Sequence, residues 1–399
     1  MSDRPVGPGP VSAEDWRVFG PMLDAALDTP PERRAQFIAQ ACGGDAAMIA
    51  RLRRLLEECE EGDALLDAGA IERFAFLLDD DETVPNFPST LAGRYHVDRE
   101  IGRGGMAIVF LAHDTTHDRP VAVKVLRPSA RARVGGERFL AEIQTTARLR
   151  HPHIVPLYDS GEIEDALYYV MPYYEAGTLA ARLEHEPQLP IAEAIQIAAD
   201  IASALEHAHT AGLIHRDIKP SNILFAGSQG GAGALLGDFG VARPVDRTER
   251  GLTSTGVVVG TPAYMAPEQL AGARTLDVRS DIYSLGCVLY EMIAGEAPAV
   301  AVSTETVALH AARTLRRLRT VRRGLAPKVE RCLSRSMSPD PSDRYASAGA
   351  MGLALAECGR AIATPDSVAG RGWQLVWNSM TGIMRAATSR GPGRDGRAD

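Results

Sequence analysis

The chain has 399 residues, of which 45% are apolar and 24% charged, and a formal net charge of −8. This length accommodates a large two-lobed domain with a smaller module, and the composition is that of a globular protein. The acidic balance argues against a general nucleic-acid binder, and no apolar run approaches the roughly 18 residues that span a bilayer.

Residues 1–78 are predicted to form a small helical region. Thr29 and Glu32 have the spacing of a helix-capping box, with Pro30 suited to the first helical position, and Asp45 can cap the next helix. The region is acidic: the first 90 residues hold 18 Asp and Glu against 8 Arg. Its role stays open between docking on the rest of the chain, dimerisation, partner binding and a plain stabilising cap. Residues 79–93 are predicted to be an acidic, proline-containing linker.

A glycine-rich segment follows, between two short runs that alternate like strands. Glycines in such a turn let backbone N–H groups approach phosphate oxygens. A glycine-rich hairpin without any ligand is the alternative. The candidate nucleotide-binding residues here are Ile101, Gly102, Arg103, Gly104, Gly105 and Val109.

The next strand, Val121–Val125, contains one charged residue, Lys124. A lysine in an apolar run is costly unless paired, so it is expected to have a carboxylate partner. The helical segment 137–149 offers Glu137 and Glu142, and Glu142 is the better candidate because it lies mid-helix. A lysine that reaches solvent at a strand edge is the alternative.

The strongest motif is His215-Arg216-Asp217-Ile218-Lys219-Pro220-Ser221-Asn222, followed by Asp238-Phe239-Gly240 and Ala266-Pro267-Glu268. In this order and spacing the motifs resemble those of the protein kinase superfamily, in particular bacterial eukaryotic-like serine/threonine kinases. The resemblance implies an α+β fold with a β-rich N-lobe of about 94–171 and a helical C-lobe of about 172–360. The glycine segment departs from the family pattern at Ala107, where the third glycine usually stands, and a modest effect is expected.

The resemblance also implies the catalytic roles. Asp217 would accept the proton of a substrate hydroxyl, or orient that hydroxyl, and Lys219 would offset charge on the moving phosphoryl group. Asn222 and Asp238 would hold Mg²⁺, with Mn²⁺ as a substitute. Lys124, paired with Glu142, would contact the ATP phosphates.

By the same resemblance, Met171 is the gatekeeper beside a hinge that recognises adenine. The Pro172 carbonyl and the Tyr174 N–H would pair with the base. The residues expected to sandwich it are Val109, Ala122 and Leu224. An aromatic strand end in the core is the alternative for the hinge.

Further residues are assigned structural or regulatory roles through the resemblance. Glu268 is expected to form a buried ion pair with Arg344, and Asp281 to brace the backbone of the catalytic loop. Phe239 belongs to the metal-binding motif as a structural residue. Thr261 would bond the catalytic Asp and Lys, which favours Ser or Thr as the acceptor.

Thr253 and Thr255 lie in a polar loop between Asp238 and Glu268. Phosphate on either threonine would add negative charge that Arg216 could pair with, ordering the loop. Autophosphorylation is therefore predicted at these threonines, with unmodified loop threonines as the alternative.

The tail, 361–399, is predicted to be mostly flexible with an amphipathic helix over 372–386. A membrane surface, a partner groove and the chain's own surface are the three candidate contacts for that helix.

The expected activity is transfer of the ATP γ-phosphoryl group to Ser or Thr of protein substrates, with homodimerisation serving autophosphorylation in trans. The five cysteines are scattered, which suits the reduced thiols of a cytoplasmic protein. A pseudokinase scaffold and a small-molecule phosphotransferase are the rival interpretations. The first normally lacks a Lys, catalytic Asp or metal-binding Asp that is present here, and the second is disfavoured by the Ala-Pro-Glu segment.

Overall fold

The structure is a computed structural model that divides into two compact units. One comprises residues 1–80 and 299–317, and the other 81–298 and 318–399. The residues that the structure describes are 22, 26, 29, 31–42, 45, 48–50, 52–53, 89–104, 107–127, 143, 145–163, 166–227, 233–239, 262–273, 275–298, 314, 317–322 and 325–362.

The described part of the first unit contains the helix α2 (Pro31–Ala41). Pro30, predicted at the first helical position, lies outside the described residues, and the described helix begins at Pro31. Ile38 is buried on its inner face. The Met48 N–H donates to Asp45 Oδ1 at 3.1 Å, so the predicted Asp45 cap is confirmed.

The second unit begins with a six-stranded antiparallel sheet in the order β1-β2-β3-β4-β6-β5. The strands are β1 (Thr90–Leu91), β2 (Tyr95–Arg103), β3 (Ala107–Asp114), β4 (Arg119–Leu126), β5 (Asp159–Ile163) and β6 (Ala166–Pro172). The strand predicted over Val121–Val125 is confirmed as the inner strand β4. Its alternate residues enter two apolar clusters, with Val121 and Val123 in one and Ala122 in the other. Both faces of the sheet are therefore packed.

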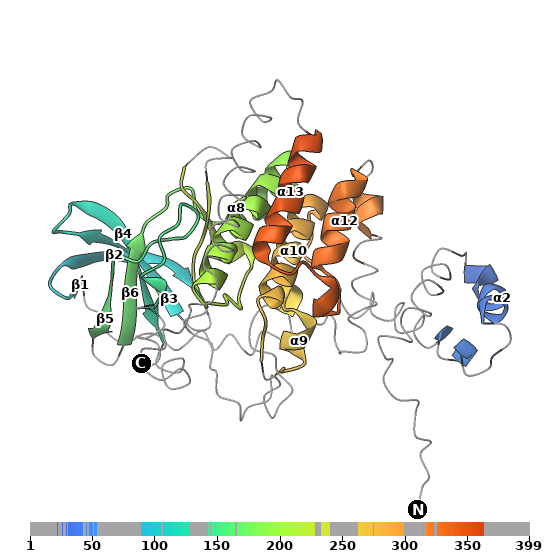
Figure 1. The fold of residues 1–399 in the computed structure, drawn as a ribbon. Helices are drawn as coiled ribbons and strands as arrows, with labels where there is room; N and C mark the ends of the chain where they lie inside the picture. The colour runs from blue at the N-terminus through green and yellow to red at the C-terminus, as the bar shows by residue number, and fades with distance from the viewer. Residues whose placement is uncertain are drawn as a thin grey trace, which may run out of the picture. The chain divides into compact units, whose positions relative to one another are not determined.

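Helices form the larger lobe of this unit, as Figure 1 shows. They are α7 (Leu179–His185), α8 (Ile191–Thr210), α9 (Pro267–Leu270), α10 (Arg279–Ala294), α12 (Pro327–Ser336) and α13 (Ala348–Ile362), with short 3-10 turns η1 (Pro220–Asn222), η2 (Pro262–Tyr264) and η3 (Pro341–Asp343). A two-stranded hairpin, β7 (Ile223–Phe225) and β8 (Ala234–Leu236), lies among them. The predicted α+β class, with a sheet lobe and a helical lobe, is confirmed.

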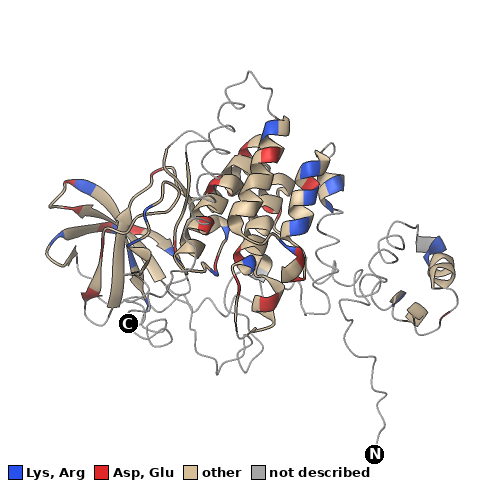
Figure 2. Cartoon of the chain, in the orientation of Figure 1, with Lys and Arg blue, Asp and Glu red and all other residues tan. Residues whose placement is uncertain are grey.

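The α8 helix is the centre of the helical lobe, because most of its 20 residues are buried. Its Glu206 carboxylate accepts the Gly349 N–H at 2.6 Å, which caps the start of α13 against α8. Charged side chains instead gather on outer helix surfaces such as that of α12 (Figure 2). Within the described residues, no helix is both long enough and apolar enough to cross a membrane.

Candidate active site

The glycine-rich segment forms the β2–β3 hairpin. Two register shifts lie in this pair, and the Gly104 N–H donates to the Ala107 carbonyl at 2.9 Å. Ala107 is buried at the start of β3 and paired with Leu126. A residue paired in a strand has an extended backbone, so the position where the family pattern has glycine holds alanine in a strand here. Arg103 bonds Glu100 on the exposed side of the hairpin.

The residues predicted to sandwich adenine lie in one apolar cluster. Ala122 and Met171 are among its buried members. The half-buried residues that pack against it include Ile101, Val109, Tyr174 and Leu224. One surface is thus formed by residues from three strands of the sheet (β2, β3 and β4), from the end of β6 and from β7 of the other lobe. These residues lie in separate motifs of the sequence, and the fold brings their side chains together.

Lys124 has a carboxylate partner, as its apolar strand requires. Its Nζ lies 2.6 Å from Asp238 Oδ2, across the two lobes. Glu142, the predicted partner, lies outside the described residues, so that pairing stays a prediction. Burial alone would raise the pKa of Asp238, but the Lys124 charge and hydrogen bond, with a further bond from Tyr169, leave it below its ordinary value.

Tyr169 is a site residue that the sequence analysis missed. It lies opposite Lys124 in the β4–β6 pair, and its hydroxyl donates to Asp238 Oδ1. Burial, and then the nearby Asp238 charge, raise the pKa of Tyr169 well above its usual range, which keeps the phenol protonated. A tyrosine in a buried strand is typical of a core, so only its pairing with Lys124 could have pointed to the site.

The β7–β8 hairpin brings the two predicted metal ligands close together. Asn222 directly precedes β7, and Asp238 is the second residue after β8. Ile223 pairs with Leu236, and the Gly237 N–H donates to the Asn222 carbonyl at 2.9 Å. Because an antiparallel hairpin aligns the start of one strand with the end of the next, both side chains come from the same end of it.

Asp217, Lys219 and Asn222 form a compact group beside this hairpin. Lys219 Nζ lies 2.9 Å from Asp217 Oδ2, and Asn222 Nδ2 donates to the Asp217 carbonyl at 2.7 Å and to Oδ2 at 3.1 Å. About a quarter of the Asp217 side chain is exposed, at 25%. These contacts hold the Asp217 carboxylate in one orientation.

The backbone of the catalytic loop is held by Asp281 of α10. Its two carboxylate oxygens accept the N–H groups of His215 and Arg216, each at 2.8 Å, and His209 Nε2 donates at 2.8 Å. Burial would raise the pKa of Asp281, but the His209 bond and charge outweigh it and lower the pKa. Asp281 thus stays ionised where the loop needs an acceptor.

His215 connects this loop to the predicted metal-binding motif. Its Nε2 donates to the Gly237 carbonyl at 2.9 Å, and its ring centroid lies 4.8 Å from that of Phe239. Complete burial lowers the pKa of His215, so the ring is neutral. The ring therefore fixes the backbone just before Asp238.

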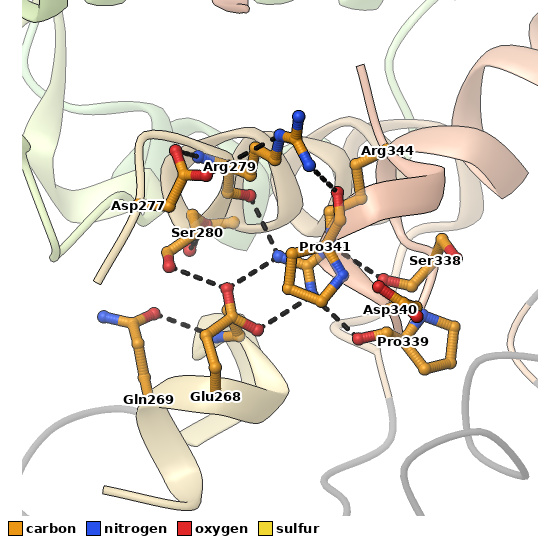
Figure 3. A network of polar contacts seen from close by, with 12 residues as sticks. Glu268, Gln269, Asp277, Arg279, Ser280, Ser338, Pro339, Asp340, Pro341 and Arg344 are labelled. Carbon is orange, nitrogen blue, oxygen red and sulfur yellow. Dashed lines mark hydrogen bonds and ion pairs between the residues drawn. The ribbon is translucent and has the colours of Figure 1, made fainter. Parts of the chain in front are cut away.

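Glu268 and Arg344 form an ion pair in the large lobe, shown in Figure 3. The two carboxylate oxygens accept from Arg344 Nη1 at 2.7 Å and Nη2 at 2.8 Å, and Ser280 also donates to Glu268. Arg344 is buried, with 1% of its surface exposed. This pair fixes α9 to the start of α10 and to the turn around η3.

The remaining predictions lie outside the described residues. They concern Gly105, Glu142, Thr253, Thr255 and Thr261, residues 54–88 with most of the linker, and 363–399 with the predicted tail helix.

The oxygen donors present suit a hard divalent cation. Asp238 offers carboxylate oxygens, and the Asn222 amide uses its nitrogen to bond Asp217, which leaves its oxygen free to ligate. Among the described residues no three His, Cys, Asp or Glu side chains gather into a metal cage. Mg²⁺ is usually held by one or two carboxylates together with substrate phosphates, and the Asp238 carboxylate with the Asn222 amide oxygen fits that pattern.

Comparison with known proteins identifies the family. The family model for the protein kinase domain matches residues 95–352, more than half of the chain. The chain belongs to the protein kinase family. It is 37% identical to the serine/threonine-protein kinase PknE of Mycobacterium tuberculosis over 287 residues, which cover 72% of this chain and 49% of that protein.

Two further similarities agree with this assignment. Serine/threonine-protein kinase PknB of M. tuberculosis is 38% identical over 270 residues, covering 66% of this chain and 42% of that protein. The crystal structure of a variant of the M. tuberculosis PknI kinase domain has a TM-score of 0.53 and 31% identity, covering 67% of this chain and 96% of that one. The chain thus spans about half the length of the curated relatives, and the likeness to PknI extends over nearly the whole of that kinase domain.

Proposed function

We propose that this protein is an active serine/threonine protein kinase, which transfers the γ-phosphoryl group of Mg-ATP to Ser or Thr of protein substrates. The observation that carries the proposal is the group of Asp217, Lys219 and Asn222 beside the Lys124–Asp238 ion pair. The names of the mycobacterial relatives support it. A pseudokinase would typically have lost Lys124, Asp217 or Asp238.

In this mechanism the chain's residues position the reactants and neutralise charge. Bound Mg²⁺, or Mn²⁺ in its place, would supply electrostatic stabilisation of the phosphates, held by oxygens of Asp238 and Asn222. Lys124, now paired with Asp238, would turn to the ATP phosphates. Asp217 would accept the hydrogen bond of the substrate hydroxyl, and Lys219 would offset charge on the transferred group.

Adenine recognition is assigned to the hinge after β6. We assign the Pro172 carbonyl and the Tyr174 N–H to the edge of the base, and Val109, Ala122 and Leu224 to its two faces. The shared apolar cluster of these side chains supports the second assignment. Proline suits its place because only a carbonyl is needed there.

Autophosphorylation of Thr253 or Thr255 is part of the proposal, with Arg216 as the phosphate partner. The Arg216 backbone is anchored by Asp281, while its buried Nε has no hydrogen-bond partner in the part of the chain that the structure describes. A buried guanidinium nitrogen without a partner favours binding of an anion. Phosphopeptide mapping after incubation with ATP and Mg²⁺ tests it, and two unmodified threonines in an otherwise active protein would refute it.

The catalytic assignment is tested by comparing phosphate incorporation in wild type, Lys124→Met and Asp217→Asn. Lys328→Met is the matched control, because Lys328 is an exposed lysine on α12. Both site variants are expected to lose at least about a hundredfold in rate, since each removes charge stabilisation or orientation at the transferred group. Equal incorporation by all four proteins would defeat the assignment, and ATP binding without any transfer by wild type would favour the pseudokinase interpretation.

We also propose a cellular location for the enzyme and a mode of autophosphorylation. The described cysteines are free and buried, which supports a reducing, cytoplasmic location. Phosphorylation in trans would require a second copy of the chain.

A further inference from the structure

Tyr169 carries an inference that goes beyond the catalytic parts assigned above. Residues directly opposite each other in an antiparallel pair point to the same face, and Tyr169 is opposite Lys124. Only 4% of its surface is exposed, and it packs in the same apolar cluster as Ala122 and Met171. A hydroxyl buried in such surroundings is costly unless bonded, and the Tyr169 hydroxyl donates to Asp238.

The tyrosine and the lysine bond different oxygens of the Asp238 carboxylate. The Tyr169 hydroxyl donates to Oδ1 of Asp238, and Lys124 Nζ lies 2.6 Å from Oδ2. Each carboxylate oxygen has two lone pairs, so a donor on Oδ1 leaves room for a cation on the same group. When Lys124 turns to the ATP phosphates, the tyrosine is the donor that remains on Asp238 from the sheet lobe.

The conformation of Asp238 makes such a support necessary. Its backbone lies in the left-handed region, with φ of 56°, which is unfavourable for a residue other than glycine. His215 fixes the preceding carbonyl, but that bond leaves the rotation of the Asp238 side chain undetermined. The phenol of Tyr169 has few rotatable bonds, so its hydrogen bond can fix the orientation of the Asp238 carboxylate plane.

We propose that Tyr169 is a positioning residue that orients the Asp238 carboxylate for the divalent cation and so sets the Mg²⁺ requirement for nucleotide binding. This rests on the proposed function, because it assumes that Asp238 is the metal ligand. Outer residues that orient metal ligands typically contribute about 10- to 100-fold in metal affinity.

A purely structural role for Tyr169 is the competing explanation, and Tyr168 provides the matched control. Tyr168 is the preceding residue of β6, is also buried, and belongs to the cluster on the other face of the sheet. Its hydroxyl lies against Gly161, where a Cβ would approach it to 2.8 Å. Replacing either tyrosine by phenylalanine removes one hydroxyl from the same strand, but only Tyr169→Phe removes a donor from Asp238.

The test measures binding of a fluorescent, non-hydrolysable ATP analogue across a Mg²⁺ titration and in EDTA. Wild type, Tyr169→Phe, Tyr168→Phe and Asp238→Asn are compared as full chains, with melting curves to verify folding. Tyr169→Phe is expected to need about tenfold more Mg²⁺ for half-maximal binding, with unchanged affinity in EDTA. Tyr168→Phe is expected to match wild type. If Tyr169→Phe does not fold, Tyr169→Met gives the same comparison.

An unchanged Mg²⁺ requirement in the Tyr169 variant would overturn the inference. So would an equal loss of affinity with and without Mg²⁺, because that is the result of lost packing alone. Failure of the proposed function gives a different pattern: wild type would bind no nucleotide, or Asp238→Asn would keep the Mg²⁺ dependence of wild type.

Discussion

The Glu268–Arg344 pair is the strongest single contact to perturb in the large lobe. All five N–H donors of the Arg344 guanidinium are bonded: two to Glu268 and one each to the carbonyls of Ser338, Pro339 and Arg279. Burial raises the pKa of Glu268, but the Arg344 bonds and charge outweigh burial and lower it. The carboxylate is therefore ionised when the protein is folded.

Arg344→Met is expected to destabilise the protein by about 3–5 kcal/mol, the usual cost of leaving one member of a buried ion pair without its partner. Three backbone carbonyls also lose a donor, which argues for the upper part of that range. For a lobe of this size the loss corresponds to a melting temperature lower by on the order of 10 °C. Arg344→Lys keeps the charge but has three donors instead of five, so its stability should lie between those of wild type and Arg344→Met.

Urea unfolding followed by far-ultraviolet circular dichroism measures these losses, with the exposed Arg331→Met on α12 as the control. A double-mutant cycle with Glu268→Gln isolates the pair. The combined variant should lose less than the two single variants together, since neither buried charge is then left alone. Strict additivity of the two losses, or a loss below about 1 kcal/mol in Arg344→Met, would refute the reasoning.

Two further predictions concern Gly286, which is buried on α10, and the half-buried His151. Gly286→Ala on α10 would bring a Cβ to 2.6 Å from Ser336 Oγ. The helix gains about 1 kcal/mol from alanine, but overpacking costs about 1–3 kcal/mol, so a net loss of stability is expected in urea unfolding. This loss should diminish when Ser336→Ala is added. Burial, then the neighbouring His153 and His207, lower the pKa of His151 to about 4. The His151 side chain is therefore protonated at a higher pH in the unfolded chain than in the folded protein, and the folding stability should fall as the pH falls from about 6.5 to 4. His151→Asn, which keeps an acceptor for the His153 N–H, should flatten this part of the curve, and an unaltered pH profile would contradict the assignment.

The elements of the site could be predicted because their signals are local. The apolar run from Val121 to Val125 indicates a packed strand wherever the strand lies in the fold, and it forms β4. The Asp45 cap is likewise a contact across three residues. The site motifs differ, since they carry roles only through resemblance, and the fold then brings Asn222 and Asp238 to one end of the β7–β8 hairpin.

The partners of the buried charges could not be derived in the same way. The sequence requires a carboxylate for Lys124, because an unpaired lysine in an apolar strand is costly, but any carboxylate meets that requirement. The structure pairs it with Asp238, more than a hundred residues away, a partner that no local pattern around Lys124 indicates. Tyr169 was missed for a related reason, since a strand of apolar and aromatic residues does not reveal which hydroxyl meets a charge.

Two residues of the site have a strained backbone and are held by contacts from several elements. Arg216 and Asp238 both have positive φ, at 67° and 56°, and such conformations cost about 1–3 kcal/mol each in residues other than glycine. Asp281 holds Arg216 by accepting its backbone N–H. Asp238 is held by Tyr169, which donates to its carboxylate, and by His215, which donates to the carbonyl of the preceding Gly237. Because Asp281 belongs to α10, which Glu268 and Arg344 also fix in place, the conformation of the catalytic loop depends on contacts that touch neither ATP nor metal. Weakening that network should therefore lower phosphoryl transfer before the lobe unfolds.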